Sequence, residues 1–215
     1  MEMLDPRDFA ATAARAIAAC AGADPAAVLA EAGLLGVIAP EAVGGLGLPL
    51  RFAVPLLEAA GGGELSFPLI ETLLLARHLP ADVAEALVAG AARGSIAWAG
   101  SLERGVVARA PLGAEADWLL VRHGDGAALL PRAACTPREA VGLDETTPEH
   151  AFAVAGPPHA ALGADAWAAL QEEALLLSRR GGNSASRWWS SRPCATCWRA
   201  RRCCWKACAA PSPAR

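Results

Sequence analysis

The spacing of apolar residues along the chain changes at Gly94, and this change constrains the fold more than any other feature. Before Gly94, apolar residues recur at the three-to-four-residue spacing of amphipathic helices. After Gly94, short apolar runs alternate with Gly, Pro and Asp at intervals typical of antiparallel sheet. We therefore expect a helical segment followed by a small antiparallel sheet, which together make an α+β fold.

Capping signals place the helices. Asp5-Pro6 and Asp24-Pro25 each put a capping side chain before a proline at the first helical position. The fifth helix is expected to run from Pro80 to a stop at Gly94. Asp165 is expected to cap a further helix after the sheet. The expected helices cover about 6–20, 25–34, 50–60, 68–78, 81–92 and 166–177.

The sheet is expected from five apolar runs, near 96–99, 106–108, 118–122, 127–130 and 151–155. His123-Gly124-Asp125-Gly126 between two of these runs is typical of a hairpin turn. We expect an all-helical N-terminal domain over 1–93, an antiparallel β domain over 94–160, one helix within 161–178, and a separate tail over 179–215.

The tail differs sharply from the rest of the chain in composition. It holds nine basic residues and no acidic one, with five of the seven Cys and four of the seven Trp. Residues 1–178 hold ten Arg against 22 acidic residues, a net charge of −12. Such a break at a point where a helix is under way has three possible origins.

Two of these origins give the tail a function. Its Trp and Arg residues could stack on and neutralise single-stranded nucleic acid, or Cys194, Cys197 and Cys203 with a fourth thiolate could bind zinc. The tail has no apolar periodicity, however, and its cysteines do not form two separated ligand pairs. Both readings are therefore disfavoured.

The third origin is a shift of reading frame. Residues 1–178 contain no Lys, Asn or Tyr, which indicates a GC-rich gene. GC-rich DNA translated out of frame yields Arg, Cys, Trp, Ser, Pro and Ala, the residues that dominate the tail. We therefore expect residues 179–215 to be an aberrant, disordered tail on a truncated chain, with no metal site.

The composition of residues 1–178 limits which kinds of partner the chain can bind. The acidic balance argues against nucleic acid or an anionic membrane, and the start of the chain lacks the regions of a signal peptide. No apolar run approaches the length of a membrane span. Cys20 and Cys135 are isolated and are expected to be reduced, buried thiols, so we expect a cytoplasmic protein.

A glycine-rich segment carries the most specific signal. Residues 29–48 read Leu-Ala-Glu-Ala-Gly-Leu-Leu-Gly-Val-Ile-Ala-Pro-Glu-Ala-Val-Gly-Gly-Leu-Gly-Leu. Gly36 can end a helix, Pro40 blocks its continuation, and Gly44-Gly45 permits a tight turn. A phosphate-binding loop is disfavoured because no strand precedes the segment and no Lys follows it. The segment closely resembles the N-terminal signature of the acyl-CoA dehydrogenase family.

Three further segments are similar to the same family in the same order. They are residues 56–61 with 67–72, then Ala116-Asp117-Trp118-Leu119-Leu120-Val121, and then Leu143-Asp144-Glu145-Thr146-Thr147-Pro148. The resemblance covers about 25–178. It implies a helical domain, a β domain and the first helix of a C-terminal helical bundle.

The resemblance also implies a reaction. Members of the family use FAD to oxidise an acyl-CoA thioester to the α,β-enoyl-CoA, with a Glu of the C-terminal bundle as base. No residue of this chain is matched to that base, so we assign no catalytic residue. Glu41, Glu58 and Glu71 are better explained as caps, solvated positions or structural pairs.

Two residues are candidates for contact with the flavin. The family's β domain carries Thr-Glu-Pro-x-x-Gly-Ser followed by Trp-Ile-Thr, and the corresponding residues 97–110 lack both motifs. Trp98 and Ser101 are the residues of this region that could still meet FAD; otherwise Trp98 is a core residue and Ser101 a turn residue.

The leading hypothesis is an acyl-CoA-dehydrogenase-like flavoprotein that is inactive as this truncated chain. The alternative is a non-catalytic subunit that supports an active partner. Either implies a homo- or hetero-oligomer of such subunits with an acyl-CoA substrate.

Overall fold

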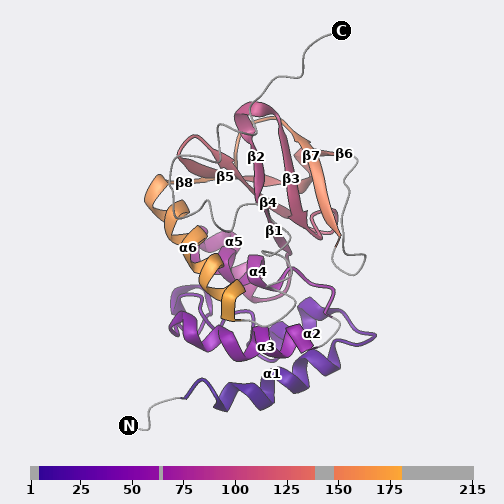
Figure 1. Cartoon of the computed structure of the whole chain (residues 1–215), viewed down its shortest axis with the longest axis vertical. Coiled ribbons are helices and arrows are strands. Elements are labelled where there is room, and N and C mark those ends of the chain that lie inside the picture. The colour runs from indigo at the N-terminus through magenta and orange to yellow at the C-terminus, as the bar shows by residue number, and fades with distance from the viewer. Residues whose placement is uncertain (1–4, 63–64, 139–147, 181–215) are drawn as a thin grey trace.

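A computed structural model describes residues 5–62, 65–138 and 148–180. In these residues a helical part precedes a sheet part, and one long helix follows (Figure 1). The predicted α+β fold is therefore confirmed. The expected tail from 181 onward, with its thiol pattern, and the segment 143–147 lie outside the described residues.

The helical part holds five α-helices close to the predicted ranges: α1 Asp8–Ala19, α2 Pro25–Glu31, α3 Val54–Gly62, α4 Leu69–His78 and α5 Ala81–Val88. Asp24 caps α2 as predicted, since its side chain accepts a hydrogen bond from the backbone N–H of Ala26 at 3.2 Å. Asp5 instead closes a turn by accepting from the N–H of Arg7 at 2.9 Å, so α1 begins only at Asp8.

Two predicted helix ends were wrong. α2 ends before Gly33 and not at about residue 34, and α5 ends before Gly90 and not at Gly94. Gly33 and Gly90 have φ of +69° and +68°, the left-handed conformation that terminates a helix. In each case the next residue donates its N–H back to the last turn, Leu34 to Leu29 and Ala91 to Ala86. In each segment the glycine that comes first in the sequence, Gly33 or Gly90, adopts the conformation that ends the helix.

The segment between α2 and α3 is held together by hydrogen bonds within its own backbone. It contains two 3-10 turns, η1 Glu41–Val43 and η2 Leu50–Ala53. The N–H groups of Leu46, Gly47 and Leu48 donate to the carbonyls of Gly36, Ala39 and Val37 at 2.8–3.1 Å. Gly44 has φ of +79°, which confirms the predicted positive-φ connection.

Two four-stranded sheets follow, in the orders β1-β4-β5-β8 and β2-β3-β7-β6. The strands are β1 Gly94–Ala97, β2 Ala99–Ser101, β3 Val106–Pro111, β4 Trp118–His123, β5 Gly126–Pro131, β6 Cys135–Arg138, β7 Glu149–Val154 and β8 Ala160–Leu162. Two 3-10 turns, η3 Leu102–Arg104 and η4 Arg132–Ala134, lie between strands. β4 and β5 form the predicted hairpin, with His123 opposite Gly126.

The sheet part differs from the prediction in one pairing. β1 and β4 are parallel, whereas the other pairs are antiparallel. The chain passes through β2 and β3 in the other sheet before it returns as β4, so the two strands are joined by a crossover and not by a hairpin. The short strands β2, β6 and β8 were not predicted as separate strands.

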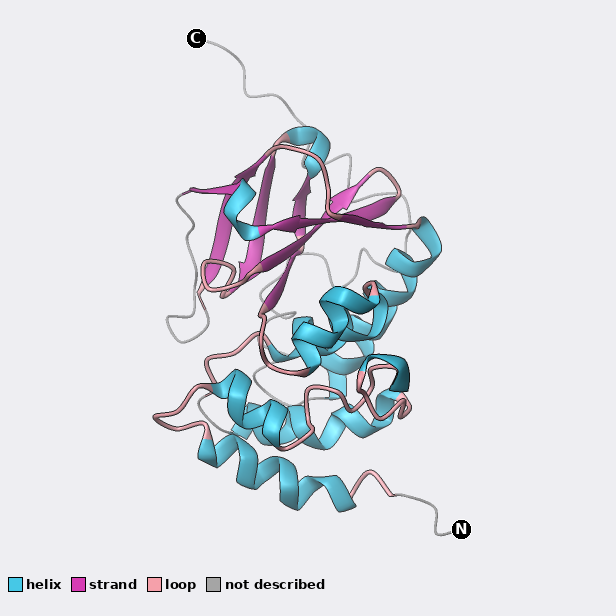
Figure 2. Ribbon diagram, turned by 180° about the vertical axis from the view of Figure 1, so that it is seen from behind, coloured by secondary structure: helices cyan, strands magenta, loops and turns pink. Residues whose placement is uncertain are grey.

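The first sheet has a core on each face. Ile96, Leu120 and Leu129 belong to the core shared with the helices, whereas Leu119 and Val121 belong to the core between the sheets. This division follows from the alternation of side chains along a strand. Figure 2 shows the strands gathered at one end of the molecule and the helices α1–α5 at the other.

The last described helix, α6 Ala164–Arg180, runs from the sheets down along the helical part (Figure 1). It extends two residues beyond the boundary expected at 178. Among the described residues, no helix is long and apolar enough to cross a membrane.

Candidate functional site

Trp98 lies where the sheets meet the helices. It follows the last residue of β1 in one sheet and precedes the first residue of β2 in the other. Its indole N–H donates to Oε1 of Glu71 on α4 at 2.9 Å. Its ring stacks on Trp167 of α6, with ring centroids 6.3 Å apart and planes inclined by 23°. Trp98 therefore joins three elements that are distant in sequence.

Glu71 explains why the indole is held there. The residue is only 6% exposed, although it carries a carboxylate. A buried charge is costly unless hydrogen bonds compensate for lost hydration, and the indole N–H supplies one. The predicted reading of Glu71 as a structural pair is confirmed. Glu41 and Glu58 are exposed, as expected of solvated positions.

Ser101 serves a different contact. It is buried at the end of β2, and its hydroxyl hydrogen-bonds to the carboxylate of Glu103 in η3. Hydrogen bonds from Ser101 and from the backbone N–H groups of Glu103 and Gly124 hold the pKa of Glu103 at about 2. The imidazole of His123 lies 3.8 Å from the same carboxylate. Ser101 and Glu103 thus tie η3 to the β4–β5 hairpin.

The backbone beside Trp98 is irregular. Gly100 has φ of +84°, and a Cβ there would lie 2.2 Å from the carbonyl oxygen of Val106. β3 carries a bulge between Val107 and Ala110, and Arg109 within it has φ of +58°. Non-glycine residues are seldom found in this conformation, and bulges often occur beside functional sites.

These contacts decide how well the two candidate residues suit a flavin. The indole N–H of Trp98 and the hydroxyl of Ser101 are both engaged within the protein. A flavin could take a hydrogen bond from these two donors only by displacing Glu71 and Glu103, whereas the hydroxyl oxygen of Ser101 can still accept a hydrogen bond. The contact of the two residues with a flavin stays a prediction.

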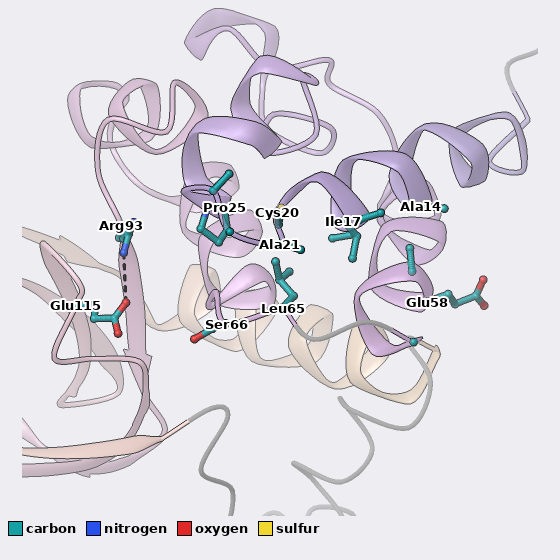
Figure 3. Close-up of a pocket in the computed structure, with 15 residues that line it drawn as sticks. Ala14, Ile17, Cys20, Ala21, Pro25, Glu58, Leu65, Ser66, Arg93 and Glu115 are labelled. Atoms are coloured by element: carbon teal, nitrogen blue, oxygen red, sulfur yellow. Dashed lines mark hydrogen bonds and ion pairs between the residues drawn. The ribbon is translucent and has the colours of Figure 1, made fainter.

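A separate cavity of about 830 Å³ lies between α1, α3 and the start of the sheets (Figure 3). Small side chains line most of it, and Arg93 closes one end by pairing with Glu115 at 3.3 Å and with Asp24. Neither Trp98 nor Ser101 lines it. The cavity is thus distinct from the Trp98 junction.

The two described thiols, Cys20 and Cys135, are buried, as predicted. Burial raises the pKa of Cys20, and the nearby Asp24 raises it further. Burial also raises the pKa of Cys135, against a smaller opposing effect of Arg132. Since the thiolate is the reactive form, neither is suited to nucleophilic catalysis. The described residues contain no group of three or more His, Cys, Asp or Glu that could hold a metal ion.

Solved structures share this arrangement of elements. The chain aligns with the ChsE4-ChsE5 complex from Mycobacterium tuberculosis with a TM-score of 0.66 at 17% identity, over 84% of this chain and 63% of that one. It aligns with a variant of the Tcur3481-Tcur3483 steroid ACAD with a TM-score of 0.65 at 22% identity, over 82% and 62%. It aligns with a glutaryl-CoA dehydrogenase from Mycobacterium smegmatis in complex with FADH2 with a TM-score of 0.61 at 16% identity, over 84% and 62%.

The chain has an acyl-CoA-dehydrogenase-like fold. It spans about 62–63% of the length of these solved structures. No family model matches the sequence, and no curated protein does. The fold therefore agrees with the resemblance in the glycine-rich segment, although the sequence has diverged far from these structures.

Two contacts of the junction were not predicted from the sequence. They are the stack of Trp167 on Trp98 and the hydrogen bond from Trp98 to Glu71. A signal for Glu71 existed, because a single carboxylate within the apolar run Leu69–Ala76 is expected to be buried and paired. The identity of its partner could not be read from the sequence.

Proposed function

We propose that this chain is an acyl-CoA-dehydrogenase-like subunit that takes part in the FAD-dependent α,β-dehydrogenation of an acyl-CoA thioester. In this proposal a partner subunit supplies the contacts that hold the flavin. The fold supports the reaction class. One similar structure is the ChsE4-ChsE5 complex and another is the Tcur3481-Tcur3483 steroid ACAD, which supports hetero-oligomeric assembly.

The observation that carries the subunit role is the engagement of Trp98 and Ser101. The donors of both side chains serve the protein's own framework. A flavin that took a hydrogen bond from the indole N–H of Trp98 would break the bond to the buried Glu71. Leaving a buried carboxylate short of a donor costs about 1–3 kcal/mol.

The second candidate function is a self-sufficient FAD-dependent acyl-CoA dehydrogenase, active as a homo-oligomer. The irregular backbone beside Trp98 favours it. The bulge in β3, the positive φ of Arg109 and the close approach at Gly100 are features often concentrated at functional sites.

Flavin retention separates the two candidates. The purified 215-residue chain is incubated with FAD and desalted, and its flavin absorbance and acyl-CoA-dependent bleaching are recorded. We expect a colourless chain that does not bleach. A yellow, bleachable chain would refute the subunit role, and loss of colour in Trp98→Ala and Ser101→Ala would then identify these residues as flavin contacts.

The subunit role also has a positive test. The chain is co-expressed with acyl-CoA-dehydrogenase-like subunits from the same genome, and complexes are purified through a tag on this chain. We expect one pair to co-purify in a fixed ratio with bound flavin that acyl-CoA bleaches. If every co-expressed subunit separates from the chain, the subunit role is wrong.

A further inference from the structure

α4 and α6 are joined at two levels along their length. α6 packs against α3, α4 and β5 (Figure 1). At the first level, Trp167 of α6 stacks on Trp98, which in turn donates to Glu71 of α4 at 2.9 Å. At the second level, the carboxylate of Glu173 on α6 contacts Arg77 and His78 in the last turn of α4.

The second level is a shared ion pair. Oε1 of Glu173 lies 3.1 Å from Nε of Arg77, and Oε2 lies 2.8 Å from Nε2 of His78. The side chains of Glu173 and His78 are only 19% and 14% exposed. Breaking a partly buried pair leaves groups without compensation, so this contact resists separation of the two helices.

The two levels match in spacing. Glu173 follows Trp167 by six residues on α6, and Arg77 follows Glu71 by six residues on α4. Six residues correspond to about 9 Å along a helix. At the first level Trp98 lies between the helices, and at the second level the helices are bound directly.

Arg77 gives the second level a fixed anchor. Its Nη1 donates to the carbonyl oxygen of Ile38 at 2.9 Å, in the segment that precedes α3. Arg77 therefore cannot follow α6 without losing this bond. Glu173 thus links α6 to a side chain that is itself bonded to the segment before α3.

We infer that Glu173 is a positioning residue that holds α6 against α4 and so determines how Trp98 is seated between the helices and the sheets. Trp98 connects one strand of each sheet, so its seating orients both sheets relative to the helical part. This inference does not rest on the proposed function. It assigns a structural role to the contacts of Glu173 with Arg77 and His78, and this role requires no contact with a flavin or a substrate.

The test compares Glu173→Gln with Glu172→Gln in the full chain. Glu172 is exposed on the same helix and provides the matched control. The first readout is the exciton component of the far-UV circular dichroism that Trp98→Phe removes. The second is amide hydrogen exchange in β1 and β2. Exchange in β1 and β2 would not respond to a contact whose effect stays local to α4 and α6. The exciton component comes from Trp98 and Trp167, so it also reports a shift of α6 itself.

We expect Glu173→Gln to weaken the exciton component and to speed exchange in β1 and β2 about tenfold, the effect of losing roughly 1.4 kcal/mol from a charged hydrogen bond. Glu172→Gln is expected to change neither. If Glu173→Gln does not fold, Arg77→Lys tests the same contact, since lysine keeps the charge and loses the fork that reaches both Glu173 and Ile38.

Two outcomes would overturn the inference. In the first, Glu173→Gln or Arg77→Lys lowers the global stability while the exciton component and the exchange in β1 and β2 stay at wild-type values. Glu173 would then be only a local ion pair. In the second, Glu172→Gln produces the same changes as Glu173→Gln, which would show that any loss of charge on α6 suffices.

Discussion

The indole of Trp98 supplies a hydrogen bond to a carboxylate that is 6% exposed. Trp98→Phe keeps an aromatic ring for the stack on Trp167 but removes this donor. We expect the free energy of unfolding to fall by about 2–4 kcal/mol, from the lost hydrogen bond and the lost ring volume together. Urea denaturation measures this change.

The control for Trp98→Phe is Trp118→Phe. Trp118 is half-buried and packs against the ring of His159, with centroids 4.7 Å apart. Trp118→Phe removes the same atoms as Trp98→Phe but does not break the bond to the buried Glu71. We therefore expect a clearly smaller fall in the free energy of unfolding. Equal effects at the two positions would show that the bond to Glu71 adds nothing to stability.

Glu173 gives the stability a defined pH dependence. Burial raises the pKa of its carboxyl, but the hydrogen bond from His78 and the charges of His78 and Arg77 outweigh burial and hold the pKa below its ordinary value of 4.5. A carboxyl with a lowered folded-state pKa stabilises the fold above its unfolded-state pKa. This contribution disappears as the pH falls through the folded-state pKa.

We therefore expect the difference in unfolding free energy between wild type and Glu173→Gln to be present above about pH 5 and to shrink as the pH falls below it. Urea denaturation at a series of pH values measures this difference. A difference that stays constant from about pH 6 to pH 3 would contradict the assignment of the charge to the folded-state ion pair.

At the scale of elements, the segment between α2 and α3 depends on close backbone approach. A Cβ at Gly45 would lie 2.2 Å from the carbonyl oxygen of Ala39. Because backbone cannot rotate away as a side chain can, Gly45→Ala is expected to destabilise by about 1–3 kcal/mol. Thermal unfolding measures the effect.

Gly163→Ala is the matched control, since its added Cβ would meet nothing within 4 Å. We expect a change within about 0.5 kcal/mol. If Gly45→Ala leaves the free energy of unfolding unchanged, the segment can shift to accept the added Cβ. The position of the Ile38 carbonyl that binds Arg77 would then not be fixed by this segment.

The sequence predicted elements far better than contacts. Apolar spacing located α1–α6 and the β4–β5 hairpin, because these depend on local chemistry. Of the three predicted caps, Asp24 is confirmed, whereas Asp5 closes a turn before α1 and Asp165 lies in the first turn of α6. Pairings between distant segments, such as β1 with β4, leave no local signature. Three-residue β8 is too short to show alternation. Trp98 and Ser101 were predicted as flavin contacts, and this stays a prediction. Their partners Glu71 and Glu103 follow from the tertiary arrangement.

At the scale of the whole molecule, the helical part and the sheet part share one core. Leu120 and Leu129 of the first sheet belong to the same cluster of buried residues as Leu73 of α4 and Leu170 of α6. The domain boundary predicted near residue 93 therefore crosses a continuous apolar core. The division into two domains stays a prediction from the sequence. Because the two parts bury apolar residues against each other, unfolding one without the other is costly.

We expect the helical and sheet parts to unfold in one cooperative step. Leu120→Ala removes a fully buried side chain from the shared core and is expected to cost about 2–5 kcal/mol. The exposed Leu176→Ala on α6 should cost no more than about 0.5 kcal/mol. Hydrogen exchange followed through urea unfolding reports α4 and β5 separately. If α4 and β5 lose protection from exchange at the same urea concentration in Leu120→Ala, the two parts unfold as a single unit. If β5 loses protection while α4 stays protected, the two parts unfold independently.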